Sequence, residues 1–148
     1  LIRKGQEKLT PELDRIQLAI LKAFCQYRKP VFGICKGMQL INIAFGGDML
    51  RHLPTAVHHA YREKDQMHPA RNEVNSFLYE VYGSDMLVNS AHHQGVGIPG
   101  RGIRYVQYAP DGVVEGLQHE FLPVYGVQWH PERLERDIKK LKKLFKIT

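Results

Sequence analysis

An apolar strand pattern runs directly into a helical pattern in the first third of this chain, with no linker between the two. Residues 31–34 are continuously apolar, which is typical of a strand buried on both faces of a parallel sheet. The helical pattern that follows from Lys36 is apolar on almost every side and ends at Gly46-Gly47, a pair suited to terminating a helix. A strand joined this closely to a buried helix predicts an α/β fold.

A cysteine between two glycines occupies the junction of strand and helix. Gly33, Cys35 and Gly37 match the Gly-x-Cys-x-Gly form of a nucleophile elbow. The reactive residue of an elbow has a strained backbone, so we expect the turn to need small residues on both sides. A thiol there also lies at the start of a helix, whose dipole favours the thiolate. A buried core thiol is the simpler alternative, but a core strand does not need the flanking glycines.

Two residues near Cys35 are placed to contribute to the same site. The amide N–H of Lys36, directly after the nucleophile, can donate to an oxyanion at the start of the helix. Gln39 is four residues after Cys35, one helical turn further on, so its side chain can face the same cavity. From spacing alone, a solvent-facing glutamine fits this position equally well.

A histidine and a glutamate near the end of the chain could supply the partners that a cysteine nucleophile requires. His130 and Glu132 flank Pro131 and follow an apolar strand pattern at 122–128. Side chains two residues apart in extended chain point the same way, so the carboxylate can orient the imidazole. A free cysteine is mostly protonated at neutral pH and needs such a base. A hydrogen-bonded surface histidine is the alternative for His130 considered by itself.

The composition indicates a globular protein and argues against several other classes. Hydrophobic residues make up 43% of the 148 residues and charged residues 24%, so we expect a single domain over residues 1–148. No apolar run approaches the roughly 20 residues that span a bilayer, and no secretory leader is expected. The two cysteines, Cys25 and Cys35, are expected to stay reduced, which favours a cytoplasmic location.

Neither the positive charge nor the histidines predict a further site. Much of the net charge of +6 lies in residues 139–146, whose apolar spacing predicts an amphipathic helix with a basic, solvated face. Nucleic-acid binding is disfavoured because no basic stripe interleaved with aromatic residues accompanies this helix. The candidate metal ligands lack the spacing of metal-binding motifs, so no metal site is expected; they are His58-His59, His68 and His92-His93.

The rest of the pattern predicts alternating helices and strands. A helix begins at Thr10-Pro11 and ends before Pro30, with a predicted buried face of five apolar residues: Leu13, Ile16, Ile20, Phe24 and Tyr27. Residues 48–72 are predicted to be an irregular loop. Further predicted elements are a short helix at 76–82, strands at 86–88, 103–109, 113–117 and 122–128, and a final helix at 134–146.

These motifs resemble those of the class I glutamine amidotransferase superfamily. The resemblance is carried by residues 33–39 with Gly46-Gly47 after them, and by residues 126–132, which read Gly-Val-Gln-Trp-His-Pro-Glu. Within the superfamily the chain is most similar to the γ-glutamyl-γ-aminobutyrate hydrolase branch, of peptidase C26 type. Residues 88–94 and 109–115 indicate that branch. The resemblance covers roughly residues 10–136.

The resemblance implies a fold and a set of site residues. The fold would be a flavodoxin-like three-layer α/β/α sandwich around a mostly parallel sheet. Cys35 would be the nucleophile, His130 the base and Glu132 its orienter, with the amide of Lys36 in the oxyanion hole. Gln39 and the segment Asn89-Ser90-Ala91 would hold the glutamyl amino-acid end of a substrate. No cofactor and no metal are implied.

The resemblance also bears on domain organisation. Family members carry a further stretch before the first helix, with about three strands and a glycine-bearing loop that usually supplies the second oxyanion donor. Residues 1–148 are therefore expected to form a single, N-terminally incomplete glutamine amidotransferase-like catalytic domain. By itself, this segment is expected to lack a complete sheet.

The expected function is hydrolysis of a γ-glutamyl amide bond through a γ-glutamyl thioester, with a γ-glutamyl amine as the small-molecule substrate. No nucleic-acid or membrane partner is expected, and a homo-oligomer is left open. The alternative is a glutaminase subunit that passes ammonia to a synthase partner. A binding protein that keeps the pocket but not the reaction is disfavoured, because the cysteine, histidine and glutamate are all present.

Overall fold

The computed structural model describes residues 11–50, 66–90 and 94–145. The helices are α1 (Pro11–Gln26), α2 (Lys36–Ala44), α3 (Phe77–Tyr82) and α4 (Glu135–Leu144). The strands are β1 (Val31–Ile34), β2 (Met49–Leu50), β3 (Gln66–Asn72), β4 (Asp85–Ser90), β5 (Gly95–Val96), β6 (Ile103–Tyr108), β7 (Val114–His119) and β8 (Val124–Val127). A 3₁₀ turn at Pro131–Arg133 lies between β8 and α4.

Six strands form one mixed sheet in the order β1-β8-β7-β6-β3-β4, so β1 is an edge of the sheet that the described residues build. β1 runs parallel to β8, with Ile34 opposite Val127. The other neighbouring pairs of this sheet are antiparallel, and β6, β7 and β8 follow one another through short turns that can join only antiparallel strands. The α/β class is confirmed. In the described residues the sheet is mixed and not mostly parallel, with β1–β8 as its parallel pair.

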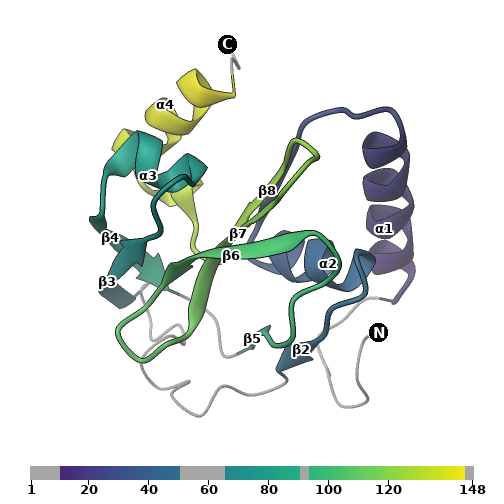
Figure 1. Ribbon diagram of the computed structural model, residues 1–148, viewed down its shortest axis with the longest axis horizontal. Coiled ribbons are helices and arrows are strands. Elements are labelled where there is room, and N and C mark those ends of the chain that lie inside the picture. Colours follow the sequence, from purple (N-terminus) through teal and green to yellow (C-terminus); the bar gives the residue numbers. More distant parts are fainter. Residues whose placement is uncertain (1–10, 51–65, 91–93, 146–148) are drawn as a thin grey trace.

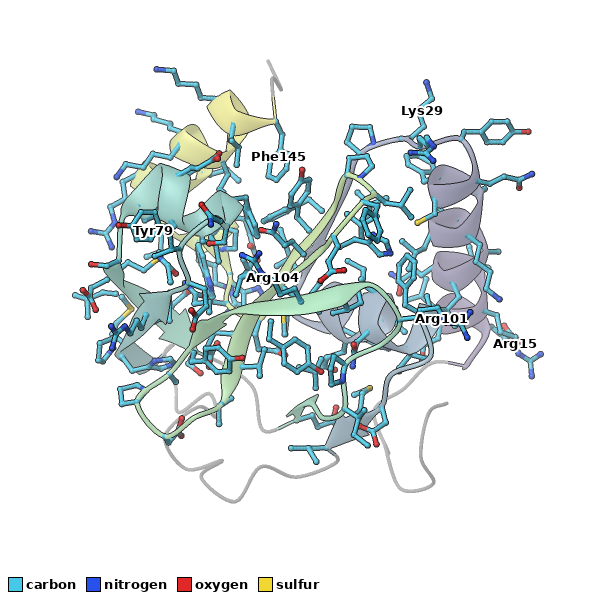
Figure 2. The ribbon with its side chains drawn as sticks, in the orientation of Figure 1. Arg15, Lys29, Tyr79, Arg101, Arg104 and Phe145 are labelled. Atoms are coloured by element: carbon cyan, nitrogen blue, oxygen red, sulfur yellow. The ribbon has the colours of Figure 1, made fainter. Side chains whose placement is uncertain are left out.

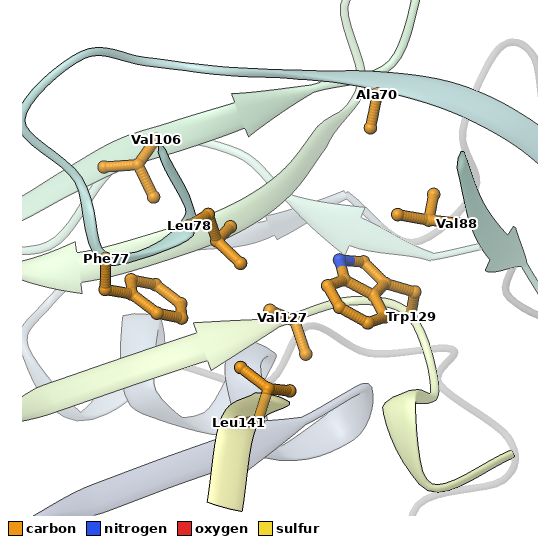
Figure 3. Close-up of a cluster of buried hydrophobic side chains, with 8 residues drawn as sticks. All are labelled: Ala70, Phe77, Leu78, Val88, Val106, Val127, Trp129 and Leu141. Atoms are coloured by element: carbon orange, nitrogen blue, oxygen red, sulfur yellow. The ribbon is translucent and has the colours of Figure 1, made fainter. Parts of the chain in front are cut away.

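Helices cover both faces of the sheet, with α1 and α2 on one side and α3 and α4 on the other (Figure 1). Because successive strand residues point to opposite faces, the sheet contributes to two separate cores. The core under α3 and α4 is shown in Figure 3 and consists of Ala70, Phe77, Leu78, Val88, Val106, Val127, Trp129 and Leu141. The core under α1 and α2 consists of Leu21, Met38, Ile41, Val96, Ile103, Leu117 and Val124.

The helix α1 forms where it was predicted, but a different face of it is buried. Asp14 and Leu21 are the buried residues, and they lie on the side that packs against α2. The five residues predicted to be buried are between 45% and 71% exposed: Leu13, Ile16, Ile20, Phe24 and Tyr27. That prediction was wrong for the described structure, because helical periodicity shows which residues share a face but not which face meets a neighbour.

The segment predicted as a loop at 48–72 contains strand structure at both ends. β2 lies at its start, and β3 takes residues 66–72, which pair along β4 from Gln66 opposite Ser90 to Arg71 opposite Asp85. Residues 51–65 lie outside the described ones. The sequence of β3 holds Pro69 and no apolar alternation, so its conformation follows from the neighbouring strand and not from local propensity.

The remaining predicted elements form within a few residues of their predicted ends. At the C-terminal end, α4 buries Leu141 while its lysines at 139, 140, 142 and 143 are exposed, as the amphipathic pattern predicted. Phe145, which follows α4, points toward the sheet (Figure 2) and makes ring contacts with Phe32 and Tyr125 at 5.0 and 5.2 Å. Within the described ranges, no helix is long and apolar enough to cross a bilayer.

Candidate active site

Cys35 occupies the turn between β1 and α2 with a strained backbone. Its φ of 53° and ψ of −108° lie in a region that residues with a side chain rarely adopt. The Cys35 amide donates to the carbonyl of Val127 at 2.8 Å, which extends the β1–β8 ladder by one residue into the turn. The nucleophile-elbow geometry predicted from the sequence is therefore present.

The two glycines that flank Cys35 serve different purposes. A Cβ on Gly33 would lie 2.6 Å from the backbone carbon of Gly37 and 2.7 Å from its oxygen, so only glycine allows β1 and α2 to approach this closely. A Cβ on Gly37 would meet no atom within 4 Å, since Gly37 faces an apolar groove of about 320 Å³ between α1, β1 and α2. The expectation that small residues are needed on both sides of the turn holds sterically for Gly33 and not for Gly37.

Burial, and not the helix start, dominates the electrostatics of the thiol. Desolvation raises the pKa of Cys35 above its ordinary value. Hydrogen bonds from the Lys36 amide and the Gln128 side chain act against this and lower the pKa, as does the charge of Arg133, whereas Glu132 raises it. The sequence-based expectation that the helix start favours the thiolate describes one contribution correctly, but burial outweighs it. This burial favours the protonated thiol over the thiolate.

His130 and Glu132 form the contact that their spacing predicted. The Nδ1 atom of His130 lies 2.5 Å from Oε1 of Glu132, and the histidine side chain is 16% exposed. With Nδ1 directed at the carboxylate, Nε2 is the ring nitrogen left to exchange a proton. His130 follows β8 as Cys35 follows β1, so the two residues come from the carboxyl ends of paired parallel strands. No hydrogen bond joins the side chains of Cys35 and His130, both of which the structure describes.

Asn89 holds the backbone of His130. Its Nδ2 donates to the His130 carbonyl and its Oδ1 accepts from the His130 amide, each at 3.0 Å. Asn89 is 1% exposed at the end of β4, so this reciprocal pair is shielded from water. The structure thus places Asn89 against the main chain of the histidine, whereas the family resemblance implied a contact with substrate.

Two of the other residues predicted to bind substrate are buried, and the Lys36 side chain is held by an ion pair. Gln39 is 4% exposed, and its Nε2 donates to Oε1 of Gln128 at 3.1 Å. Ser90 is fully buried at the end of β4. The Nζ of Lys36 lies 2.6 Å from the buried carboxylate of Asp14 on α1, which ties that helix to the elbow. Ala91 lies outside the described residues.

Gln128 is the site residue that the sequence analysis did not single out. It is fully buried, and its Nε2 donates to the Cys35 sulfur at 3.4 Å. The sequence holds a signal for it, because Gln128 precedes His130 by two residues and therefore faces the same side of the chain. The same two-residue spacing that relates His130 to Glu132 also relates Gln128 to His130.

The histidines considered as metal ligands are largely beyond the described part of the chain. Residues 58, 59, 92 and 93 are not described. His68 lies on β3, with Nε2 3.6 Å from Oε1 of the buried Glu115 on β7. In residues 11–50, 66–90 and 94–145, no group of three or more histidine, cysteine, aspartate or glutamate side chains is arranged to hold a metal ion.

Comparison with known proteins identifies the fold and the family of this chain. The structure resembles a crystal structure of a glutamine amidotransferase from Thermotoga maritima with a TM-score of 0.70 and 17% identity, over 97% of this chain and 57% of that one. The flavodoxin-like fold of class I glutamine amidotransferases is thereby confirmed. The sequence profile of the peptidase C26 family matches residues 3–132, and the chain belongs to that family.

Two curated relatives are about one-third identical to this chain over part of their length. The putative glutamine amidotransferase-like protein YvdE of Lactococcus lactis is 34% identical in an alignment of 131 residues that covers 82% of this chain and 54% of YvdE. The γ-glutamyl-γ-aminobutyrate hydrolase PuuD of Escherichia coli K12 is 33% identical in an alignment of 139 residues that covers 82% of this chain and 53% of PuuD. The chain thus spans about half the length of these relatives.

Proposed function

We propose that this protein is a cysteine hydrolase that cleaves a γ-glutamyl amide bond, with a γ-glutamyl amine as its substrate. The observation that carries the proposal is the placement of Cys35 and the His130–Glu132 pair at the carboxyl ends of two paired parallel strands. A strained thiol and an oriented imidazole at one end of a sheet match the requirements of acyl transfer. Membership of the peptidase C26 family and similarity to PuuD support the substrate class.

In the proposed first half-reaction, His130 takes the proton of the Cys35 thiol and the sulfur attacks the γ-carbonyl carbon. The raised pKa of Cys35 makes this proton transfer necessary, because burial disfavours a standing thiolate. The Lys36 amide, already a hydrogen-bond partner of the sulfur, donates to the developing oxyanion. The carbon–nitrogen bond then breaks, and His130 returns the proton to the leaving amine.

In the second half-reaction, water hydrolyses the γ-glutamyl thioester. His130 removes a proton from the attacking water, the carbon–sulfur bond breaks, and the sulfur is reprotonated. Glu132 stabilises the imidazolium that forms in each half, through its contact with Nδ1. The products are glutamate and a free amine, and no cofactor takes part in either step.

The proposal is tested by measuring glutamate and amine release from a panel of γ-glutamyl amides that includes glutamine. Cleavage of γ-glutamyl amines in preference to glutamine, lost in Cys35→Ala, is the expected result. Release of ammonia from glutamine alone would instead assign the protein to the glutaminase subunits that work with a synthase. If no substrate gives cysteine-dependent release, the hydrolase proposal is rejected.

The contacts of Asn89 lead to a prediction about its role in this reaction. Asn89→Ala is expected to lower kcat by about 10- to 100-fold with little change in KM, because a misplaced base slows the chemistry without weakening binding. Steady-state kinetics on the best substrate of the panel measure both quantities. Asn72→Ala is the matched control, since Asn72 is also buried and bonds the Gly83 carbonyl through its amide. A raised KM with unchanged kcat would return Asn89 to the substrate-binding role.

A further inference from the structure

Two buried glutamines connect the α2 helix to the sulfur of Cys35. Gln39, on α2, donates from Nε2 to Oε1 of Gln128 at 3.1 Å, and Gln128 donates from its own Nε2 to the sulfur at 3.4 Å. Gln128 is 0% exposed and Gln39 is 4% exposed. Water therefore has little access to either amide, and the two side chains depend on each other for hydrogen bonding.

The main chain of Gln128 is also held in place. Its amide donates to the carbonyl of Glu115 on β7 at 2.8 Å, directly after the paired residues Val127 and Gly116. With the backbone fixed, the side chain has one remaining choice, which is whether its oxygen or its NH₂ group faces Cys35. A primary amide accepts at one end and donates at the other, so these two orientations present opposite groups to the sulfur.

We propose that Gln128 is a positioning residue for the nucleophile, and that Gln39 keeps its NH₂ group turned toward the Cys35 sulfur. The inference rests on the proposed function of Cys35 as the attacking thiol. An NH₂ group stabilises a thiolate, whereas an amide oxygen at the same place would stabilise the thiol. Gln39 thereby influences the reactivity of a sulfur with which it has no hydrogen bond of its own.

The charged groups near Cys35 cannot replace the hydrogen bond from Gln128 to the sulfur. Glu132 and Arg133, in the turn after β8, act on the thiol in opposite directions. The Lys36 side chain is engaged with Asp14 of α1, so its charge is balanced by a carboxylate 2.6 Å away. The Lys36 amide is the other hydrogen-bond donor to the sulfur, and it is fixed by the helix. Gln128 is the donor whose direction a side-chain change can alter.

The experiment is a pH titration of Cys35 alkylation by iodoacetamide, followed by mass spectrometry of the peptide that holds Cys35. Gln128→Met is expected to raise the midpoint by about one pH unit and to slow alkylation at pH 7 about tenfold, since a hydrogen bond to a charged group is lost. Gln39→Met is expected to raise the midpoint by less, because Gln128 then turns between two orientations. If Gln128→Met does not fold, Gln128→Leu removes the same donor without adding a charge beside the sulfur.

Gln107→Met is the matched control. Gln107 is a fully buried glutamine of the same sheet that bonds Asn72 and Trp129 and has no hydrogen bond to Cys35. Its substitution is expected to lower stability and leave the midpoint of Cys35 unchanged. A wild-type midpoint in Gln128→Met overturns the proposal. A shift in Gln128→Met with none in Gln39→Met overturns the role of Gln39.

The titration uses no substrate, so it separates this inference from the proposed function. If the midpoints shift but the protein hydrolyses no γ-glutamyl amide, the roles of Gln128 and Gln39 are supported and the proposed hydrolase function is rejected. If the protein hydrolyses γ-glutamyl amides but the midpoints do not shift, the hydrolase function is supported and the roles of Gln128 and Gln39 are rejected.

Discussion

Replacing Cys35 by alanine is expected to abolish hydrolysis of γ-glutamyl amides, with kcat/KM falling by about 10⁴-fold or more. In the proposed mechanism the sulfur forms the bond to the acyl carbon, and alanine has no atom that could take its place. His130 and Glu132 would remain in contact but would have no thiol to deprotonate. Initial rates of glutamate release at substrate concentrations well below KM measure the loss in kcat/KM.

Cys25→Ala is the matched control for this experiment. Cys25 is the other free cysteine of the chain and lies on α1, partly buried against the core under α1 and α2. Burial raises the pKa of Cys25 as well as that of Cys35, so the two thiols differ chiefly in their neighbours. Cys25→Ala is expected to retain wild-type turnover. Activity that survives in Cys35→Ala, or that disappears only in Cys25→Ala, would contradict the assigned nucleophile.

Replacing Gly33 by alanine is expected to destabilise the protein by about 3 kcal/mol, the upper end of the usual cost of overpacking. The added methyl group would lie 2.6 Å from the backbone carbon of Gly37 and 2.7 Å from Cδ1 of Ile41. The Ile41 side chain can move, but the Gly37 backbone belongs to α2 and cannot yield without separating the helix from β1. Denaturant unfolding followed by circular dichroism gives the free-energy difference.

Gly37→Ala supplies the contrast, because the same methyl group would there enter open space. Alanine is the better helix former, so the free energy of unfolding is expected to stay unchanged or to rise by up to about 1 kcal/mol. Equal destabilisation by the two substitutions would show that the turn itself requires both glycines. A loss confined to Gly33→Ala would show that the approach of β1 to α2 is what requires glycine.

The local elements of the fold could be predicted from the sequence because each has a local cause. Residues 31–34 and the helix after Lys36 were evident from apolar runs and from the glycines that bound them. The short helix predicted at 76–82 forms as α3, and the structure adds its local cause: the Ser76 hydroxyl accepts from the amide of Tyr79 at 3.1 Å. β3 was not evident from the sequence, because its strand conformation depends on pairing with β4, from Gln66 opposite Ser90 to Arg71 opposite Asp85.

For the candidate site, the sequence predicted the contacts between residues that are close in the chain. The spacing of His130 and Glu132 was enough to predict their hydrogen bond, because a residue and its second neighbour share a side of an extended chain. The contact of Asn89 with His130 spans 41 residues, and that of Gln128 with Cys35 spans 93. No local sequence pattern encodes a contact between residues that are so far apart along the chain.

By itself, the sequence determined the α/β class, the elbow at Cys35 and the pairing of His130 with Glu132, since all of these follow from periodicity and short spacing. Tertiary structure alone decided which face of α1 is buried, which flanking glycine is sterically required, and how close Gln128 lies to the sulfur. The physical reason is that burial and hydrogen bonding between distant segments depend on which surfaces meet, and the order of strands in the sheet sets this.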